Sequence, residues 1–128
     1  MRLLLDTQVA LGALTDSPRL SGKARMLIEQ VKNDIYFSAA SVWEIAIKHR
    51  LARSDMPVSG VEAARLFGEA GYIELPVTAL HTAATEQLPP LHEDPFDRIL
   101  VAQAFSEPLR LLTHDRQLPA YGEWVEFV

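Results

Sequence analysis

Four carboxylates stand beside predicted strand ends or helix starts, where α/β proteins tend to place their functional side chains: Asp6, Glu44, Asp97 and Asp115. If the fold brings them together, they repel one another and raise one another's pKa values, so a positive group is expected between them. The chain contains no cysteine, and oxygen ligands without sulfur favour a hard cation such as Mg²⁺ or Mn²⁺. These side chains are therefore the candidate metal ligands and catalytic residues.

A hard cation held by carboxylates suits the hydrolysis of a phosphodiester. Such an ion activates water, orients the phosphate and stabilises the charge of the transition state. The net charge of -5, from 12 Lys and Arg against 17 Asp and Glu, argues against a surface that coats nucleic acid without specificity. Nucleic acid would instead be bound through the metal or a local basic patch. The candidate substrate contacts lie close in sequence to the acidic positions: Lys48, Arg98, Thr113 and Arg116.

Helix capping is a structural explanation that the residues leave open for these acidic positions. Asp6 precedes a predicted helix, and aspartate is a good N-cap. Ser41 and Glu44 have the spacing of a capping box, in which the helix begins at Ser41. Asp94 is a strong N-cap for a later helix, and Asp97 falls in the first turn of that helix, where acidic residues are favourable. Capping explains each position singly but not the convergence of several like charges.

The elements that must position these residues alternate along the chain. The unbroken apolar run at 3–5 predicts a strand buried on both faces, as in the middle of a parallel sheet covered by helices. Further strands are predicted at 35–38, 72–75, 109–113 and 124–127, the last at a sheet edge. Helices are predicted between them at 9–14, 21–31, 41–51, 63–70, 78–87 and 94–107. This alternation predicts an α/β fold with a mostly parallel five-stranded sheet.

The connections bring the carboxylates to one edge of that sheet. Asp6 ends the first strand. The helix that carries Glu44 follows the second strand after only a few residues, so its N-terminus lies at the carboxyl edge. The helix that starts near Asp97 leads directly into the fourth strand and must run antiparallel to it, which returns Asp97 to the same edge. Asp115 follows the end of that strand at Thr113.

The composition predicts one compact domain over residues 1–128, because 48% of the chain is hydrophobic and Gly and Pro are few. The apolar run near the N-terminus is too short for a signal peptide, and no later run approaches ~20 residues, so a soluble, cytoplasmic protein is expected. His81 is expected at the surface, and Val31 on the apolar side of its helix. A basic cluster at the end of the helix with Glu44 is expected to interact with the helix dipole: Lys48, His49, Arg50 and Arg53.

Four blocks of the sequence, in this order, resemble PIN-domain proteins, specifically the ribonuclease toxins of bacterial toxin–antitoxin pairs of the VapBC type. These blocks are Leu4-Leu5-Asp6-Thr7, the segment 38–48, the segment 94–104 and Thr113-His114-Asp115. The resemblance covers essentially the whole chain and implies an α/β/α sandwich around a parallel sheet. It also implies RNA endonuclease activity that depends on Mg²⁺ or Mn²⁺, inhibition by a cognate antitoxin, and a homodimer. The acidic site implied by the resemblance falls on Asp6, Glu44, Asp97 and Asp115.

The chain departs from the usual pattern of these proteins near its start, where it has Gln8 and Gly12 in place of His and Trp. These positions leave the metal site unchanged and concern only contacts with partner or substrate. Two other classes remain open. A receiver-like phospho-acceptor domain also has an aspartate after a buried strand but gives no reason for Glu44 or for the block around Asp97. The other is a PIN fold that binds without catalysis.

Overall fold

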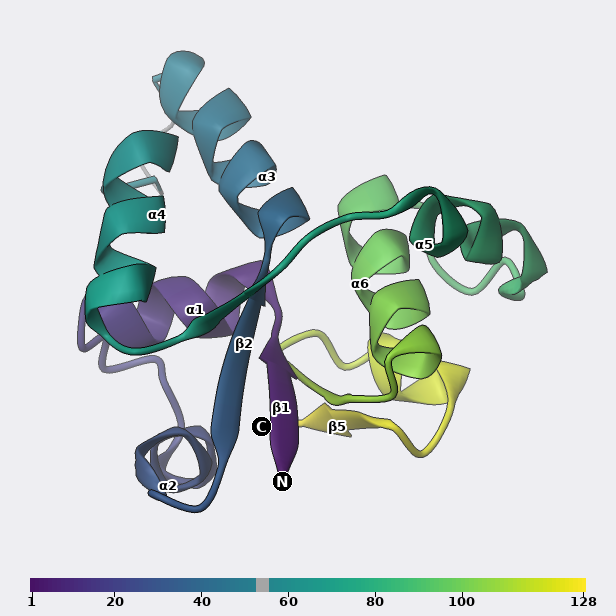
Figure 1. Cartoon of the computed structure of the whole chain (residues 1–128), viewed down its shortest axis with the longest axis horizontal. Coiled ribbons are helices and arrows are strands. Elements are labelled where there is room, and N and C mark those ends of the chain that lie inside the picture. Colours follow the sequence, from purple (N-terminus) through teal and green to yellow (C-terminus); the bar gives the residue numbers. More distant parts are fainter. Residues whose placement is uncertain (53–55) are drawn as a thin grey trace.

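The computed structural model describes residues 1–52 and 56–128, and the predicted alternation of strands and helices is confirmed (Figure 1). Its elements are, in order, β1 (Arg2–Leu5), α1 (Thr7–Leu14), α2 (Gly22–Glu29), β2 (Asp34–Ser38), α3 (Ala39–Arg50), α4 (Gly60–Glu69), β3 (Ile73–Leu75), α5 (Ala79–Ala84), the 3₁₀ turn η1 (Thr85–Gln87), α6 (Pro95–Ser106), β4 (Arg110–Thr113), the 3₁₀ turn η2 (Leu118–Tyr121) and β5 (Val125–Phe127). Arg53, predicted to belong to the basic cluster after α3, lies outside the described residues.

The described strands form one parallel sheet in the order β3-β2-β1-β4-β5. The strand β1 lies at the centre, with Leu5 opposite Phe37 of β2 and Leu112 of β4. This confirms the prediction of a central, fully buried first strand, since Leu3, Leu4 and Leu5 are all inaccessible to solvent. The edge position predicted for the last strand is also confirmed.

Helices cover both faces of the sheet, which gives the three-layer sandwich (Figure 1). Successive side chains of a strand point to opposite faces, so Leu3 and Leu5 join a core with residues of α1, α2, α3 and α4. Leu4 points the other way and packs with residues of α6 and η2. The two cores hold α3 and α6 against the sheet, and both helices begin at its carboxyl edge.

The start of α3 differs from the prediction. The helix begins at Ala39, and Ser38 is its N-cap, with Ser38 Oγ accepting a hydrogen bond from the Ala40 amide at 3.0 Å. Ser41 therefore lies inside the helix, and the predicted capping box with Glu44 is wrong. Ser38 Oγ also donates to Oε1 of Gln103 at 2.6 Å, a fully buried residue of α6. This tertiary bond favours the earlier start of the helix, because it requires Ser38 at the cap.

Two further predictions about single residues are wrong. His81 is buried rather than exposed, because its ring accepts from the Thr78 amide at 3.1 Å and contacts Glu107 at 2.5 Å. Val31 lies beyond the end of α2 at Glu29 and is 98% exposed, so it contributes nothing to an apolar helix face. Among the described residues, no helix combines the length and the apolar character needed to cross a bilayer.

Candidate metal centre

Asp6 connects β1 to α1 and is held from two directions. Its Oδ1 accepts a hydrogen bond from the Val9 amide at 2.8 Å, which confirms the N-cap prediction. Its Oδ2 accepts from the Thr113 hydroxyl at 2.6 Å and from the His114 amide at 3.0 Å. Burial raises the pKa of Asp6 above its ordinary value, although these three hydrogen bonds lower it. The two donors at the end of β4, Thr113 and His114, are not needed for capping, so they indicate a further role for this carboxylate.

Glu44 is buried and is oriented by contacts outside any helix cap. Its Oε1 lies 2.7 Å from the Thr7 hydroxyl, which also lies 2.9 Å from the Ser41 hydroxyl. A hydroxyl has one proton, so Thr7 donates to the carboxylate and accepts from Ser41. The other oxygen, Oε2, pairs with Lys48 at 2.9 Å, one turn along α3. Thr7 therefore links the N-terminus of α1 to the carboxylate on α3.

Asp97 lies in the first turn of α6, after the N-cap Asp94, whose side chain accepts from the amide at position 96. Burial raises the pKa of Asp97 to about 7, with further increases from the charges of Asp94, Asp6 and Glu44, while His92 lowers it. Because the charges of Asp6 and Glu44 act on Asp97, these three carboxylates belong to one cluster at the carboxyl edge.

Asp115 is tied to the same cluster through Thr113 at the end of β4. The Thr113 hydroxyl donates to Asp6 and accepts from the Asp115 amide at 3.0 Å. Thr113, a predicted substrate contact, is thus fully buried, with its hydroxyl occupied on both sides. It acts as a spacer between two acidic residues and does not face a substrate.

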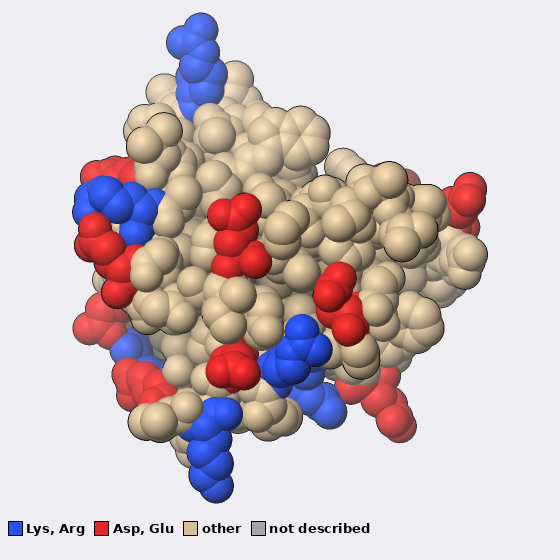
Figure 2. All heavy atoms as spheres, in the orientation of Figure 1, with Lys and Arg blue, Asp and Glu red and all other residues tan. Residues whose placement is uncertain are grey.

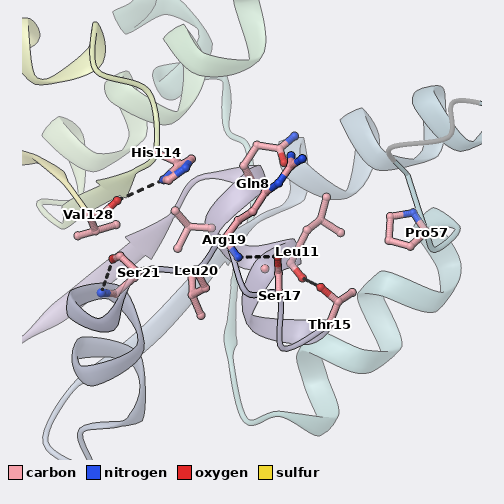
Figure 3. A pocket seen from close by; sticks show the side chains of 13 residues that line it. Gln8, Leu11, Thr15, Ser17, Arg19, Leu20, Ser21, Pro57, His114 and Val128 are labelled. Atoms are coloured by element: carbon pink, nitrogen blue, oxygen red, sulfur yellow. Dashed lines mark hydrogen bonds between the residues drawn. The ribbon is translucent and has the colours of Figure 1, made fainter.

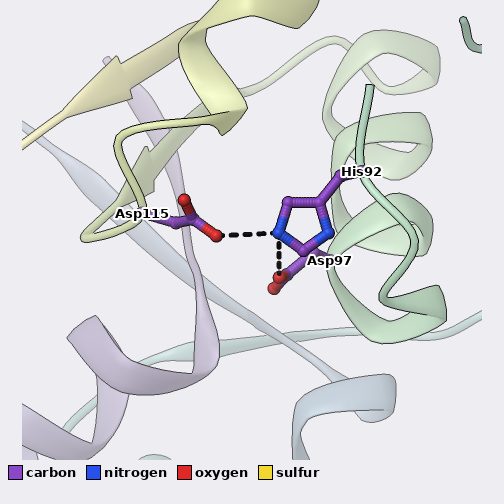
Figure 4. Close-up of side chains that lie close together, drawn as sticks. All are labelled: His92, Asp97 and Asp115. Atoms are coloured by element: carbon purple, nitrogen blue, oxygen red, sulfur yellow. Dashed lines mark hydrogen bonds and ion pairs between the residues drawn. The ribbon is translucent and has the colours of Figure 1, made fainter. Parts of the chain in front are cut away.

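His92 is the site residue that the sequence analysis missed. Its Nε2 lies 2.9 Å from Asp115 Oδ2 and 3.4 Å from Asp97 Oδ2 (Figure 4). Its Nδ1 accepts from the Asp94 amide at 3.1 Å, so in the neutral ring the proton is on Nε2 and points at the two carboxylates. The position of His92, two residues before a helix N-cap, is the signal in the sequence that could have identified it.

The predicted basic contacts have different surroundings. Arg98 donates to the carbonyls of Pro89 and Thr85 and to the Tyr121 hydroxyl, at 3.0, 2.8 and 3.1 Å. Arg98 therefore fastens the segment before α6, and its predicted contact with a substrate stays a prediction. Lys48 remains beside the cluster through Glu44, and the Arg116 guanidinium stacks 4.7 Å from the centre of the Phe127 ring.

The comparison with family models decides the family, because the model described as PIN domain matches residues 3–123. The chain belongs to the PIN domain family. The match spans Asp6, Glu44, Asp97 and Asp115, and it sets aside the receiver-like alternative.

Solved structures share the fold of this PIN domain at low sequence identity. One is VapBC2 from Rickettsia felis bound to a DNA fragment from the VapBC2 promoter. It gives a TM-score of 0.72 and 15% identity over 100% of this chain and 99% of that one. FitAcB from Neisseria gonorrhoeae gives a TM-score of 0.58 and 20% identity over 88% of this chain and 87% of that one. FitAB bound to an IR36 DNA fragment gives a TM-score of 0.60 and 18% identity over 98% of this chain and 94% of that one. A search of curated proteins gave no significant match.

The donors at the acidic edge of the PIN domain fit a hard divalent cation. Within the described residues, His92, Asp97 and Asp115 form a group whose potential ligand atoms lie within 4.8 Å of one another. The His92 ring presents an N–H to this space and is a hydrogen-bond partner there, so the carboxylate oxygens are the groups that would hold a cation. The pKa of Asp97 is raised first by burial and then by the charges of Asp94, Asp6 and Glu44, so the negative charge around Asp97 is not fully balanced by the protein.

The distribution of basic residues on the surface of the PIN domain agrees with the net charge of -5, which argues against a surface that coats nucleic acid. On the face in Figure 2, the Lys and Arg side chains of the described residues stand singly or in small groups among acidic and uncharged ones, without a continuous basic area.

Proposed function

We propose that this PIN domain is the metal-dependent RNA endonuclease of a toxin–antitoxin pair. The observation that supports this most directly is the convergence of carboxylates on Asp97, whose pKa burial and the neighbouring charges raise to about 7. Such a cluster suits Mg²⁺ or Mn²⁺, with Asp6, Glu44, Asp97 and Asp115 as ligands. When bound, the ion lowers the pKa of a water molecule and stabilises the charge that develops on the phosphate.

The residues around the carboxylates have distinct tasks in this proposal. Thr7 orients Glu44, and the Thr113 hydroxyl fixes the spacing between Asp6 and the segment of Asp115. His92 holds Asp97 and Asp115 toward each other through its Nε2 proton. Such hydrogen bonds fix the orientation of metal ligands, and their removal commonly lowers metal affinity by roughly tenfold or more.

The experiment that tests the activity is incubation of total cellular RNA with the purified chain in EDTA, Mg²⁺ or Mn²⁺, followed by mapping of the cut sites. We expect discrete cuts in Mg²⁺ or Mn²⁺ and none in EDTA. A single-stranded DNA of the same sequence as a cut RNA tests the substrate class, and we expect it to remain intact. Equal cleavage in EDTA would contradict the role of the metal. Metal binding without any cleavage would favour the non-catalytic PIN fold.

The proposed partner is an antitoxin protein, and the proposed assembly is a homodimer. The support for the antitoxin comes from the solved structures with the same fold, which are VapBC2, FitAcB and FitAB. We expect a basic side chain of the antitoxin to approach the acidic cluster and replace the charge of the metal. Copurification with the protein encoded beside this one, followed by Mn²⁺ titration, tests this competition; an unchanged metal affinity would contradict it. Light scattering of the isolated chain tests the dimer. Because RNA is the proposed substrate, the cytoplasm is the proposed place of action.

A further inference from the structure

A cavity of about 590 Å³ lies between α1, the segment that leads into α2, and the C-terminal residues (Figure 3). It belongs to neither the metal ligands nor the residues that orient them. Its volume falls within the range of small-molecule sites, which is about 300–1,000 Å³. The cavity is therefore large enough for one planar aromatic heterocycle.

The lining of this cavity is apolar on one side and polar on the other. Leu11, Leu20 and Val128 contribute apolar surface. Gln8, Arg19 and His114 also line the cavity, and all three are exposed (Figure 3). These three residues come from three separate segments and together offer an amide, a guanidinium and an imidazole.

The polar groups offer both hydrogen-bond donors and acceptors. His114 Nδ1 lies 3.2 Å from the Val128 carbonyl oxygen, which can only accept, so Nδ1 carries the proton and Nε2 of the neutral ring is an acceptor. Gln8 supplies a donor and an acceptor, and Arg19 supplies donors only. Within the described ranges, no carboxylate pairs with Arg19. This combination can match the edge of a nucleobase.

The cavity is joined to the reacting centre through the backbone. Gln8 follows Thr7, which orients Glu44, and the His114 amide donates to Asp6 at 3.0 Å. A nucleotide bound here would thus place a neighbouring phosphate close to the acidic edge. An apolar side chain of a protein partner could make the apolar contacts in the cavity but could not form hydrogen bonds with Gln8, Arg19 and His114.

We propose that this cavity binds one nucleobase of the RNA next to the cleaved phosphate and so sets sequence preference, an inference that rests on the proposed function. The base lies on the apolar side, and Gln8, Arg19 and His114 read its edge. RNA-binding proteins recognise unpaired bases through the same combination of apolar or stacking contacts and edge hydrogen bonds.

Gly12 keeps the cavity open. It lines the cavity from the middle of α1, and a Cβ placed there would make only ordinary contacts, 3.5 Å from Leu20 Cδ1 and 3.9 Å from Ser17 Cβ. A side chain at this position therefore fits at its base and extends into the cavity.

The test uses the uncharged nucleosides adenosine, guanosine, cytidine and uridine as probes, so that binding is independent of metal and of cleavage. Amide shifts of the ¹⁵N-labelled full chain are followed by NMR in EDTA. We expect at least one nucleoside to shift the signals of residues 8, 12, 19 and 114. Gly12→Trp, which fills the cavity, and Arg19→Ala, which removes an exposed donor, should each weaken that binding by about fivefold or more. Arg65→Ala, an exposed residue of α4 that pairs with Glu69, is the matched control and should change nothing.

A second readout is the base frequency around mapped RNA cuts. We expect Arg19→Ala to relax a preference at one position beside the cut while cleavage continues. The proposal is overturned if no nucleoside shifts these signals and Gly12→Trp leaves the cut-site preference unchanged. It is also overturned if Gly12→Trp abolishes only the copurification of a protein partner, which would assign the cavity to that partner. Nucleoside binding without any RNA cleavage would contradict the proposed nuclease function but would still support a nucleobase-binding site.

Discussion

The carboxylate of Glu44 is oriented by two groups that a helix cap does not require. Thr7 holds one oxygen from α1, and Lys48 holds the other from the next turn of α3. A buried carboxylate is tolerated when it is paired and hydrogen-bonded in this way, and these contacts fix both of its oxygens in position. We therefore expect the charge of Glu44, and not only its shape, to matter for metal binding.

Glu44→Gln tests this expectation. The amide oxygen can still accept from Thr7, and Lys48, which is partly exposed, can turn its ammonium toward solvent when the ion pair is lost. The free energy of unfolding should therefore change by no more than about 1 kcal/mol. Loss of the charge from a Mg²⁺ or Mn²⁺ site should weaken metal binding and slow RNA cleavage by about two orders of magnitude or more. Calorimetric titration with Mn²⁺ and thermal melts measure the two effects. The control is Ser38→Ala, which loses both the cap and the bond to Gln103, should cost about 1–3 kcal/mol of stability and leaves the carboxylate in place. A stable Glu44→Gln variant with normal metal affinity would show that the charge has no role in the site.

The raised pKa of Asp97 predicts how the stability of the metal-free protein depends on pH. The folded value of about 7 lies above the ordinary aspartate value of 3.8, so the folded protein holds this proton more tightly than the unfolded chain. The contribution to stability is complete below about pH 4 and is lost as the pH rises through about 7. We expect the melting temperature in EDTA to include a decrease over this window, and Asp97→Asn to remove most of that component. A pH profile identical in the two proteins would contradict the raised pKa.

Metal binding should release the same proton. At pH 6.5, a large fraction of Asp97 is protonated in the metal-free protein, because its pKa is raised to about 7. Metal ligands must be deprotonated, so Mn²⁺ binding should release a substantial fraction of one proton, and less at pH 8. Calorimetry in two buffers that differ in ionisation enthalpy measures this number. A release that does not fall between pH 6.5 and 8 would assign the proton to another group.

At the scale of the elements, hydrophobic periodicity and short connections were sufficient to predict the parallel sheet and the edge at which the carboxylates meet. Buried polar contacts between distant segments were not predictable in this way. The start of α3 depends on the bond between Ser38 and Gln103, which are 65 residues apart in the sequence. The burial of His81 depends on Glu107 and Gln103 in the same manner. His92 was missed for a related reason, since its role depends on Asp115 after β4.

Gln103 is expected to contribute stability through the elements it joins. It is fully buried in α6, accepts from Ser38 and donates to the carbonyl of Pro76 at 3.2 Å. Gln103→Met should leave the Pro76 carbonyl without a donor and the Ser38 hydroxyl without an acceptor, and should destabilise the fold by about 1–3 kcal/mol. Urea unfolding measures this change. The same substitution at exposed Gln87 should change stability by less than about 0.5 kcal/mol. Equal effects at the two positions would mean that the buried network is unimportant.

At the scale of the whole molecule, the net charge of -5 and the scattered basic residues limit how RNA is held. Lys48 and Arg116 remain as candidate phosphate contacts, and each contact to a single strand contributes about 0.7 to the salt slope. The logarithm of the RNA affinity should therefore fall with the logarithm of salt concentration with a slope of about -1 to -2. Fluorescence anisotropy of a labelled RNA in Ca²⁺ measures it. A much steeper slope would reveal a basic surface that this account omits.

A matched pair of substitutions at the start of α6 tests most directly whether the converging carboxylates bind a cation that supports RNA hydrolysis. Asp97→Asn removes a proposed ligand, whereas Asp94→Asn keeps a good N-cap three residues earlier and removes an equal charge. The measurement is the rate of Mn²⁺-dependent cleavage of one mapped RNA by the two variants and the unchanged protein. We expect Asp97→Asn to lower the cleavage rate by about two orders of magnitude or more. The rate of Asp94→Asn should stay within about tenfold of that of the unchanged protein. Equal rates for the two variants, or an active Asp97→Asn, would contradict this role of the carboxylates.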